Sequence, residues 1–398
     1  MARFLFVVPP LTGHVNPTVS VAHELEGLGH EVAWVGYPSK VAPLLPPGAR
    51  LLELDDDAYA ALEAGFAEET RRVRLLESVV FLWDRFLVPL THAMVPGVDR
   101  AVDAWAPDLL VVDQQALAGA AVARRRGLRW ATLATSAADA LDRDEPGANV
   151  IWDFIDAQYA RVQEALGLAV WARPDNSPDL VVVFSTRALF GDVPLPAAYR
   201  FVGPAITQRP AVAFPWEELR DGPKVLVSLG TVNPQRGRPF YRQVAEGLGG
   251  EPYQVILVAP ESLLPDAVPN NFLVRQYVPQ LRLLAEVDAV LCHAGQNTVS
   301  EALAHGVPLV MTPIRDDQPI VAGLVARAGA GIRLRFGKRL RATHLREAVG
   351  RVLTEPGFRA AAGRVRGSFE AAGGARRAAE LLVDLQQAGA PHPPQGGH

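Results

Sequence analysis

The chain has 398 residues, with 39 Lys and Arg against 43 Asp and Glu, which gives a formal net charge of −4. One domain usually takes about 150 residues, so this length predicts two or three domains and excludes a small scaffold held together by disulfides. The near balance of charge excludes a strongly basic surface for nucleic acid or anionic membranes and leaves small molecules as the expected partners. The single cysteine, Cys292, fits a reducing compartment, so we expect a cytoplasmic protein.

Apolar runs in the first half of the chain predict a parallel sheet. Short runs alternate with segments of helical periodicity, as expected when helices connect parallel strands that are buried on both faces, so the predicted fold class is α/β. Strands are predicted at residues 4–8, 31–35, 109–112, 130–133 and 180–184. The first run meets Pro9 and Pro10 too soon for a signal peptide. No apolar stretch approaches the ~18 residues that a membrane span needs.

The first helix has clearly marked predicted ends. Asn16 can cap its N-terminus and Pro17 suits its first turn. Gly29 can stop the helix, because glycine accepts the left-handed backbone that often follows a last helical turn. A helix between Asn16 and Gly29 is therefore expected to connect the first two strands.

A proline-rich segment separates the two halves of the chain. Residues 204–219 include Pro204, Pro210 and Pro215 and few core positions, which predicts an interdomain linker. A second alternating series follows, with strands predicted at residues 224–228, 254–258, 272–275, 289–292 and 309–312. The last residues, 389–398, are rich in Pro and Gly and are expected to be disordered.

Two residues of the first half are placed where a parallel sheet binds its ligands. His14 follows the first strand and Asp113 ends the apolar run at 109–112, so both can lie at the carboxyl ends of strands. An imidazole can take a hydroxyl proton, and a carboxylate on its other nitrogen fixes the tautomer and stabilises the imidazolium. The alternative is structural: His14 satisfies loop backbone and Asp113 caps a turn. Spacing alone leaves both interpretations open.

The second half contains a candidate phosphate site. A strand at 289–292 leads through His293 and Gly295 into a helix whose first turn can contain Asn297 and Thr298. A helix N-terminus offers free backbone N–H groups and a favourable dipole to a phosphate. The alternative is an ordinary loop in which Thr298 and Glu301 form a capping box. The small residues after the strand at 224–228, beginning with Ser228, offer a second loop for phosphate oxygens.

Further along, Asp317 and Gln318 precede another predicted helix. A carboxylate beside an amide supplies the acceptors and donors that suit adjacent sugar hydroxyls. The alternative is an exposed helix start that is rich in capping residues.

Several common sites are missing from the sequence. No Gly-x-Gly-x-x-Gly follows a predicted strand and no Gly-x-x-x-x-Gly-Lys occurs, which disfavours dinucleotide-dependent oxidoreductases and P-loop enzymes. The acidic run at residues 55–57 is interpreted as an exposed loop, because no nucleotide site is recognisable around it. No His or Cys cluster has the spacing of metal ligands, so we expect neither a metal nor a bound cofactor.

Together these motifs resemble the GT-B fold UDP-glycosyltransferase family, which includes bacterial macrolide and antibiotic glycosyltransferases. The likeness runs from Pro-Pro-Leu-Thr-Gly-His-Val-Asn-Pro at 9–17 to the last helices. Its most specific motifs are Tyr-Val-Pro-Gln at 277–280, His-Ala-Gly-Gln-Asn-Thr at 293–298, Glu-Ala-Leu at 301–303, Gly-Val-Pro at 306–308 and Asp-Gln at 317–318. The chain departs from the family at Tyr277, where Trp is frequent, and at Val321-Ala322, where Asn-Ala is common.

The resemblance implies two Rossmann-like parallel-sheet domains that face each other across a cleft. The first, residues 1–203, would bind the acceptor, and residues 220–374, after the linker, would bind a nucleotide-sugar donor. A helix at 375–388 would cross back to the first domain, followed by the tail at 389–398.

The resemblance also implies roles for individual residues. Three residues would contact the nucleobase: Tyr277, Val278 and Gln280. Five would hold the diphosphate: Ser228, His293, Gly295, Asn297 and Thr298. Glu301 would hold the ribose hydroxyls, and Asp317 with Gln318 would read the sugar. His14, oriented by Asp113, would be the general base.

Acceptor contacts are expected in the first domain, from a helical segment and from residues near strand ends: Phe81, Trp83, Gln114, Ser136 and Trp152. Aromatic residues at helical spacing usually belong to the core, so core packing is the alternative for Phe81 and Trp83. An apolar pocket lined by such residues would suit a small hydrophobic acceptor.

The predicted function is an inverting, metal-independent transfer of a hexose or deoxyhexose. The donor would be a UDP- or dTDP-sugar, and the acceptor a hydroxyl of a small apolar natural product. Two alternatives remain: a transferase acting on a lipid-linked or carotenoid-like acceptor, and a non-catalytic protein that binds sugar nucleotides. The expected partners are therefore donor and acceptor, with no nucleic acid and no membrane span, and a homodimer is left open.

Overall fold

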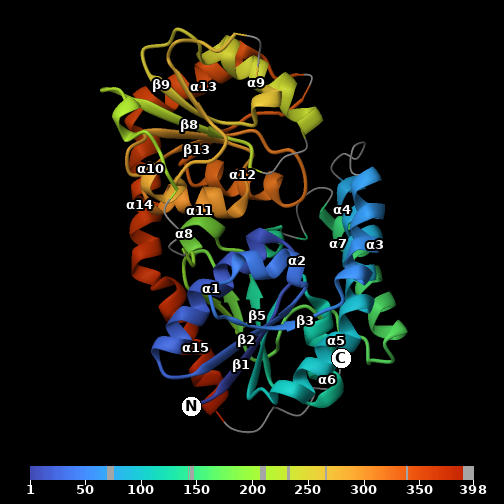
Figure 1. The fold of residues 1–398 in the computed structure, drawn as a ribbon. Coiled ribbons are helices and arrows are strands. Elements are labelled where there is room, and N and C mark those ends of the chain that lie inside the picture. The colour runs from blue at the N-terminus through green and yellow to red at the C-terminus, as the bar shows by residue number, and fades with distance from the viewer. Residues whose placement is uncertain are drawn as a thin grey trace. The chain divides into compact units, whose positions relative to one another are not determined.

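The computed structural model describes residues 1–69, 76–141, 143, 148–206, 212–230, 234–264, 267–337 and 339–388. The chain forms two compact units, each built on one parallel sheet (Figure 1). The first unit contains Met1–Thr186, Asp192–Thr207 and Ala372–His398, and the second contains Arg187–Gly191 and Gln208–Ala371. Residues 207–211 of the predicted linker and the predicted tail at 389–398 lie outside the described residues. The two parallel sheets confirm the predicted α/β class.

Seven strands form the sheet of the first unit, in the order β3-β2-β1-β4-β5-β6-β7. They are β1 (Arg3–Val7), β2 (Glu31–Gly36), β3 (Arg50–Glu53), β4 (Leu109–Asp113), β5 (Trp130–Ala134), β6 (Val181–Val183) and β7 (Tyr199–Phe201). The five predicted strands are confirmed, and β3 and β7 are additional. Both additional strands lie at sheet edges, where β3 has no buried residue and β7 has one, so neither shows a continuous apolar run.

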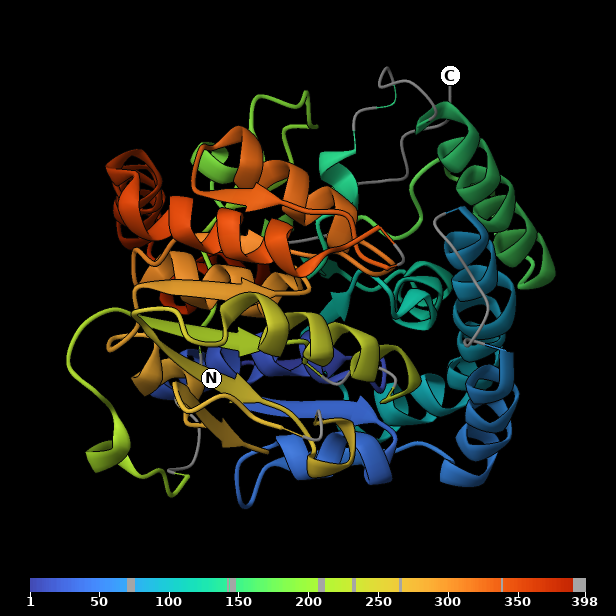
Figure 2. The same ribbon diagram turned by 90° about the horizontal axis from the view of Figure 1, so that it is seen from above.

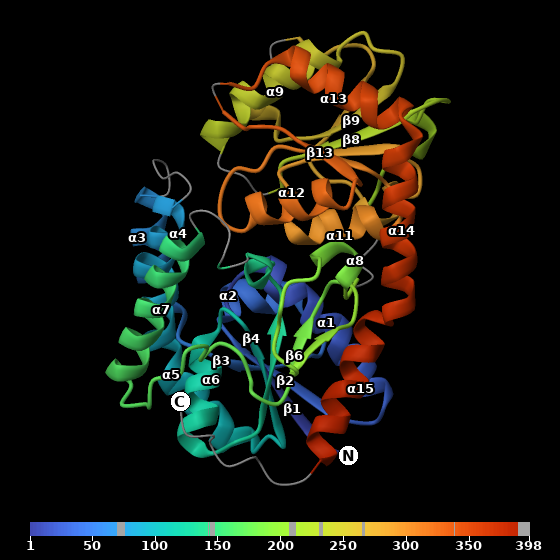
Figure 3. The same cartoon turned by 180° about the vertical axis from the view of Figure 1, so that it is seen from behind.

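Helices cover both faces of this sheet. They are α1 (Thr12–Gly27), α2 (Pro38–Val41), η1 (Ala42–Leu44), α3 (Asp56–Glu69), α4 (Leu76–Leu82), the π-helical turn η2 (Trp83–Leu87), α5 (Val88–Trp105), α6 (Leu117–Arg126), η3 (Ala138–Ala140), α7 (Ala148–Ala165) and α15 (Gly374–Gln387). Alternate residues of β1 enter two separate cores: Leu5 and Val7 pack with α5 and α6, whereas Phe4 and Phe6 pack with α1 and α15. Helices α3, α4, α5 and α7 gather on one flank of the unit (Figure 3).

Helix α1 begins one turn earlier than the sequence indicated. Backbone N–H groups of His14 and Val15 donate to the carbonyl of Leu11, so the first turn closes at Thr12 and Pro17 lies inside the helix. Asn16 is therefore not the N-cap, and Leu11, which takes that place, makes no side-chain cap. The predicted end is confirmed, because the helix stops at Gly27 and Gly29 has a φ of 83°. The correction places His14 in a helical turn rather than in a free loop.

The helical run Glu77–Trp105 has 29 residues and a mean hydropathy of 1.2 over 18 residues, enough by length and composition to cross a membrane. The sequence shows no continuous apolar stretch of this length, because Asp84 and Arg85 interrupt the apolar residues. Within the described ranges this is the one helix that passes the test, and half of that window is buried. Its apolar side chains, Phe86 and Met94 among them, pack in the core beside α6, which accounts for the composition.

The last helix, α15, returns to the first unit, as predicted. It packs against α1 (Figure 1), and Ala378, Ala379 and Leu382 are fully buried there. The N–H of Gly374 donates to the carbonyl of Val202 at 2.6 Å and ties the start of this helix to the end of the seven-stranded sheet. The chain therefore closes the first unit with its C-terminal helix.

Six strands form the sheet of the second unit, in the order β10-β9-β8-β11-β12-β13. They are β8 (Lys224–Ser228), β9 (Gln254–Val258), β10 (Phe272–Arg275), β11 (Ala289–Cys292), β12 (Leu309–Met311) and β13 (Gly331–Arg333). The five predicted strands are confirmed, and the missed β13 is a short edge strand with one buried residue.

The helices of this unit are α8 (Arg187–Phe190), η4 (Trp216–Glu218), α9 (Pro234–Leu248), η5 (Glu261–Leu263), α10 (Gln280–Leu283), α11 (Gln296–Ala304), α12 (Gln318–Arg327), α13 (Ala342–Thr354) and α14 (Pro356–Ala372). The yellow α9 and the orange-red α13 lie side by side (Figure 2), and both pack into the core of the six-stranded sheet through residues such as Val244 and Leu345. The predicted ligand loops of this unit all follow strands of this one parallel sheet.

Candidate functional site

His14 and Asp113 touch at the carboxyl edge of the first sheet. Strand β4 ends at Asp113 and pairs in parallel with β1, which leads through a short turn into α1. Nδ1 of His14 lies 3.0 Å from Oδ1 and 3.1 Å from Oδ2 of Asp113. The side chain of Asp113 is fully buried, whereas that of His14 is 14% exposed. The structure thus brings together His14 and Asp113, the two residues predicted to lie at the carboxyl ends of strands.

The contact determines where the imidazole carries its proton. An ionised carboxylate can only accept hydrogen bonds, so the hydrogen in the contact belongs to Nδ1 of His14. Nε2 then carries a lone pair. A histidine in this tautomer can take a proton from a hydroxyl, and the buried carboxylate of Asp113 offsets the positive charge that results.

A third residue, Thr135, contacts both His14 and Asp113. It was not among the predicted site residues. Its hydroxyl donates to Oδ2 of Asp113 at 2.6 Å, and its Oγ1 lies 2.7 Å from Nδ1 of His14. The N–H of Gln115 donates to Oδ1 of the same carboxylate at 2.8 Å. Thr135 directly follows β5, the neighbour of β4, so a polar residue after a strand was the available signal.

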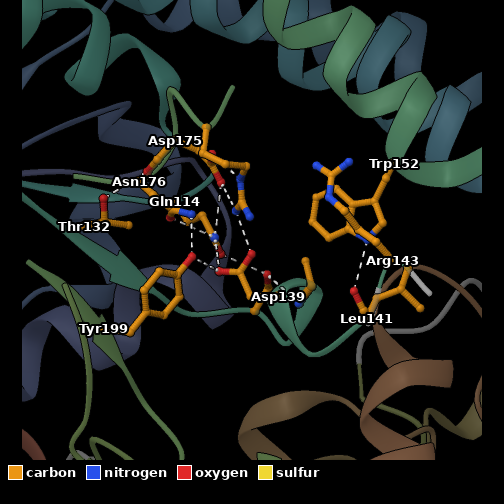
Figure 4. A network of polar contacts seen from close by, with 12 residues as sticks. Gln114, Thr132, Asp139, Leu141, Arg143, Trp152, Asp175, Asn176 and Tyr199 are labelled. Atoms are coloured by element: carbon orange, nitrogen blue, oxygen red, sulfur yellow. Dashed lines mark hydrogen bonds and ion pairs between the residues drawn. The ribbon is translucent and has the colours of Figure 1, made fainter. Parts of the chain in front are cut away.

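Gln114, next to Asp113, enters a buried polar network (Figure 4). Its Nε2 lies 2.8 Å from Oδ2 of Asp139, 3.2 Å from Oδ2 of Asp175 and 3.2 Å from Oδ1 of Asn176. The amide therefore has more acceptors than its two hydrogens can serve. Gln114, predicted as an acceptor contact, has its amide nitrogen engaged inside the first unit.

Arg173 supplies the positive charge of this network. Its Nη2 lies 2.6 Å from Oδ1 of Asp139 and 2.7 Å from Oδ2 of Asp175. Burial works against the charged guanidinium, but the two carboxylates outweigh it and raise the pKa of Arg173. The hydroxyl of Tyr199 donates to Asp139 at 3.0 Å. The network ties the segment after β5 to the segment before β6 and to β7.

Two other predicted acceptor residues lie beside the network. Ser136 is buried, and its hydroxyl lies 3.4 Å from Oε1 of Gln114. Trp152 is also buried, and its Nε1 donates to the carbonyl of Leu141 at 3.0 Å (Figure 4). The guanidinium of Arg143 stacks 4.7 Å from the ring centre of Trp152. Both residues thus have partners within the first unit.

The predicted aromatic residues of the helical segment differ in burial. Trp83 is buried and meets Tyr159 edge to face, with ring centres 5.0 Å apart. Trp83 therefore packs in the core, which was the alternative to its predicted contact with the acceptor. Phe81, on α4, is only half-buried.

In the second unit, His293 follows β11 and lies against two glycines. A Cβ on Gly230 would stand 2.8 Å from Cε1 of the ring, and a Cβ on Gly295 would stand 2.6 Å from Nε2. Gly230 also has a φ of 63°, which disfavours other residues. Ser228, which ends β8, pairs with Cys292 immediately before His293. The loops after β8 and β11 therefore meet around the imidazole.

His293 is neutral near neutral pH. Burial lowers its pKa from 6.5 to about 4, a hydrogen bond with the Ser228 backbone opposes this shift in part, and the charge of Arg315 adds to it. A neutral imidazole keeps one N–H. It can donate to an anion without bringing a second charge into the site.

The low pKa of His293 predicts a pH-dependent stability. Between pH 6.5 and 4 the unfolded chain binds more protons than the folded unit, so the free energy of unfolding falls as the pH falls through this window. We expect His293→Asn to reduce that fall, measured by urea denaturation across the window. His344→Asn, which changes an exposed histidine of the same unit, serves as the control. An unchanged pH profile in His293→Asn would contradict the assignment.

Helix α11 presents its N-terminus at the same edge of the sheet. Gly295 is the N-cap, without a side-chain cap, and Asn297 and Thr298 lie in the first turn. The capping box considered for Thr298 and Glu301 is therefore absent. Glu301 is buried, and its Oε2 accepts from Nε2 of Gln280 at 2.6 Å. The structure thus joins two of the predicted donor residues, from α10 and α11.

The remaining donor candidates lie on segments that follow β10 and β12. Tyr277 is 78% exposed, and Val278 beside it is half-buried. Asp317 is the N-cap residue of α12 and Gln318 the first helical residue. Oε1 of Gln318 accepts from the backbone N–H of Ile314 at 2.9 Å and so shapes the loop after β12.

Within the described residues no three His, Cys, Asp or Glu side chains are grouped as metal ligands.

The family model for UDP-glucoronosyl and UDP-glucosyl transferase matches residues 221–366 of the chain. The 4'-demethylrebeccamycin synthase of Lentzea aerocolonigenes is 29% identical, over 96% of this chain and 99% of its own length. The chain is a glycosyltransferase, and the part of it at residues 221–366 matches the UDP-glycosyltransferase family.

Solved structures agree on the fold of this glycosyltransferase. SnogD, a glycosyltransferase from Streptomyces nogalater, has a TM-score of 0.74 at 25% identity, covering 97% of this chain and 99% of SnogD. The glycosyltransferase VinC, solved in complex with dTDP, has a TM-score of 0.72 at 21% identity, covering 97% of this chain and 100% of VinC. The two parallel-sheet units are those of the GT-B fold. The residues matched by the family model all lie in the second unit of the glycosyltransferase.

Proposed function

We propose that this glycosyltransferase moves a hexose or deoxyhexose from a UDP- or dTDP-sugar to a hydroxyl of a small apolar natural product, with inversion. One observation carries the proposal: Nδ1 of His14 is held by the buried carboxylate of Asp113, which leaves Nε2 as a base. The relative named 4'-demethylrebeccamycin synthase and the neighbour solved in complex with dTDP support the choice of acceptor and donor class.

The reaction is a single displacement. Nε2 of His14 takes the proton of the acceptor hydroxyl while the oxygen attacks the anomeric carbon of the donor sugar. The bond from that carbon to the diphosphate oxygen breaks, and the nucleoside diphosphate leaves with the electron pair. Attack from the face opposite the leaving group inverts the anomeric configuration. The Nδ1 hydrogen stays on His14, and Asp113 stabilises the imidazolium.

The diphosphate binds where the loops after β8 and β11 meet. Ser228 and Gly295, together with Asn297 and Thr298, offer hydroxyl, amide and backbone donors to the phosphate oxygens, and the dipole of α11 favours the negative charge. The neutral His293 adds an N–H. These donors offset the charge of the leaving group. The reaction that we propose therefore uses neither a metal nor another cofactor.

The rest of the donor is read by side chains around this loop. Glu301 accepts from the ribose hydroxyls, and Gln280 holds its carboxylate in place through the 2.6 Å hydrogen bond. The exposed ring of Tyr277, with Val278 beside it, stacks on the nucleobase. Asp317 and Gln318 contact sugar hydroxyls.

The acceptor binds in the first unit beside His14. Phe81 is the half-buried aromatic residue among the predicted contacts, so we assign apolar contact with the acceptor to this side chain first. The other predicted contacts support the acceptor site indirectly, through the packing and hydrogen bonds that they already make. They are Trp83, Gln114, Ser136 and Trp152. We place the reaction in the cytoplasm.

A panel of nucleotides tests the donor class. We expect UDP or dTDP to raise the thermal stability and GDP and NAD to leave it unchanged, because a ligand at about 100 times its Kd stabilises by about 2.7 kcal/mol. Turnover of the matching sugar nucleotide, with the product anomer assigned by NMR, then tests inversion. Stabilisation by NAD alone would overturn the proposal, and binding of UDP without any transfer would favour a non-catalytic protein.

Substitutions of Gln318 test the sugar contact. Gln318→Glu keeps an oxygen for the N–H groups of Ile314 and Arg315 but removes the amide hydrogens. We expect it to weaken binding of the sugar nucleotide by about fivefold and that of the free nucleoside diphosphate by less than twofold, since one hydrogen bond is worth roughly 1 kcal/mol. Calorimetry with both ligands measures this. Equal losses would show that Gln318 only shapes the loop.

A further inference from the structure

We infer that Thr135 is a positioning residue for the base, and that its hydroxyl fixes the imidazole of His14 on the carboxylate of Asp113. The inference rests on the proposed role of His14. Oγ1 lies 2.7 Å from Nδ1 of His14 and 2.6 Å from Oδ2 of Asp113, so the three side chains form a closed triangle. Thr135 is buried, which keeps water from competing for these bonds.

The hydrogens in the triangle have only one consistent arrangement. The carboxylate of Asp113 has none to give, so Thr135 donates its single hydroxyl hydrogen to Oδ2. The lone pairs of Oγ1 then face Nδ1 of His14, and the Nδ1 hydrogen is shared between Oγ1 and the carboxylate. The hydroxyl dipole therefore points its negative end at the imidazole and its positive end at Asp113. It stabilises both charges of the pair that forms when Nε2 takes a proton.

The backbone holds Thr135 in this position. Strands β4 and β5 pair in parallel with Asp113 opposite Leu133, and the N–H of Gln114 donates to the carbonyl of Leu133 at 3.0 Å. Thr135 lies two residues after Leu133 and directly follows β5. The network around Gln114 and Asp139 ties the segment after β5 to the rest of the unit. The hydroxyl thus lies directly after a paired strand, in a segment held by these hydrogen bonds.

A hydroxyl at this position has a function that shape alone does not provide. Valine has nearly the volume and the branching of threonine, and β-branched residues suit a strand end, so Thr135→Val preserves packing and removes only the hydroxyl. Thr135→Ser retains the hydroxyl and removes a methyl group. The two variants separate the hydrogen bonds from the packing.

The experiment compares both variants in steady-state kinetics with UDP-glucose and dTDP-glucose as donors and 4-methylumbelliferone as acceptor. We expect Thr135→Val to lower kcat about tenfold with both KM values within about twofold of the parent, since one hydrogen bond that acts in the transition state is lost. Thr135→Ser should stay within about twofold. In an Asp113→Asn background, Thr135→Val should add less than about twofold, because the partner of its hydroxyl is already changed. A normal kcat in Thr135→Val, or an equal loss in Thr135→Ser, would overturn the inference.

A second measurement needs no substrate. The exchange with water of the Nδ1 hydrogen of His14, followed by NMR of the free protein, should be about fivefold faster in Thr135→Val and unchanged in Thr135→Ser, since one of its acceptors is lost. Equal exchange in all three proteins would refute the positioning role. His14→Ala separates the two levels of the argument. If that variant stays active, the proposed base fails; if it is inactive while Thr135→Val behaves as the parent, only the role of Thr135 fails.

Discussion

His14→Ala loses most of the transfer activity: we expect kcat to fall about 10²- to 10⁴-fold, the usual contribution of a general base. The physical reason is the geometry at the end of β4. Asp113 holds Nδ1 of His14, and in the proposed mechanism the lone pair of Nε2 receives the proton of the acceptor. Alanine removes that lone pair. Steady-state kinetics with the donor identified by the nucleotide panel measures the loss.

The control lies on the same helix. His23 is an exposed residue of α1, so His23→Ala changes a histidine of this helix without touching Asp113 and should keep full activity. Binding of UDP or dTDP to His14→Ala, measured by calorimetry, should equal that of the parent, because the proposed donor-binding residues lie in the second unit. Near-normal turnover by His14→Ala would remove the base from the mechanism. Lost nucleotide binding would instead indicate a role for His14 in holding the donor.

The contact between His14 and Asp113 was predictable because it depends on topology. The carboxyl ends of parallel strands lie at one edge of a sheet, so residues after β1 and at the end of β4 meet once these strands are neighbours. The same argument applies to Ser228 and His293 after the paired β8 and β11. In both cases the apolar runs identified the strands, and the strand order in the structure brought the residues together.

What the sequence did not reveal depends on side-chain geometry. Thr135 resembles any polar residue after a strand, and only the distances to His14 and Asp113 distinguish it from Ser136 beside it. The start of α1 was misplaced because Asn16 and Pro17 are good capping residues, yet backbone hydrogen bonds to Leu11 close the helix one turn earlier. Local preference was outweighed there by the path from β1 into α1.

The two glycines around His293 have a role that no motif stated. A motif names Gly295 as part of a phosphate loop, but the contacts show both Gly230 and Gly295 against one edge of the imidazole. Gly230 needs its positive φ, whereas Gly295 has a φ of −64°, which any residue can adopt. At Gly295 a substitution therefore acts through space and not through backbone strain. This makes Gly295 the cleaner position at which to test the role of the imidazole.

Gly295→Ala should displace His293 and weaken donor binding on the order of 10- to 100-fold. The new Cβ would stand 2.6 Å from Nε2 of the ring, and overpacking of this kind costs about 1–3 kcal/mol. The ring must turn, and its N–H no longer meets the diphosphate. Calorimetry with UDP or dTDP measures the loss. Gly350→Ala, in α13 of the same unit with nothing within 4 Å of the new Cβ, should bind the nucleotide normally. Equal binding by Gly295→Ala and the parent would show that the orientation of His293 does not matter to the donor.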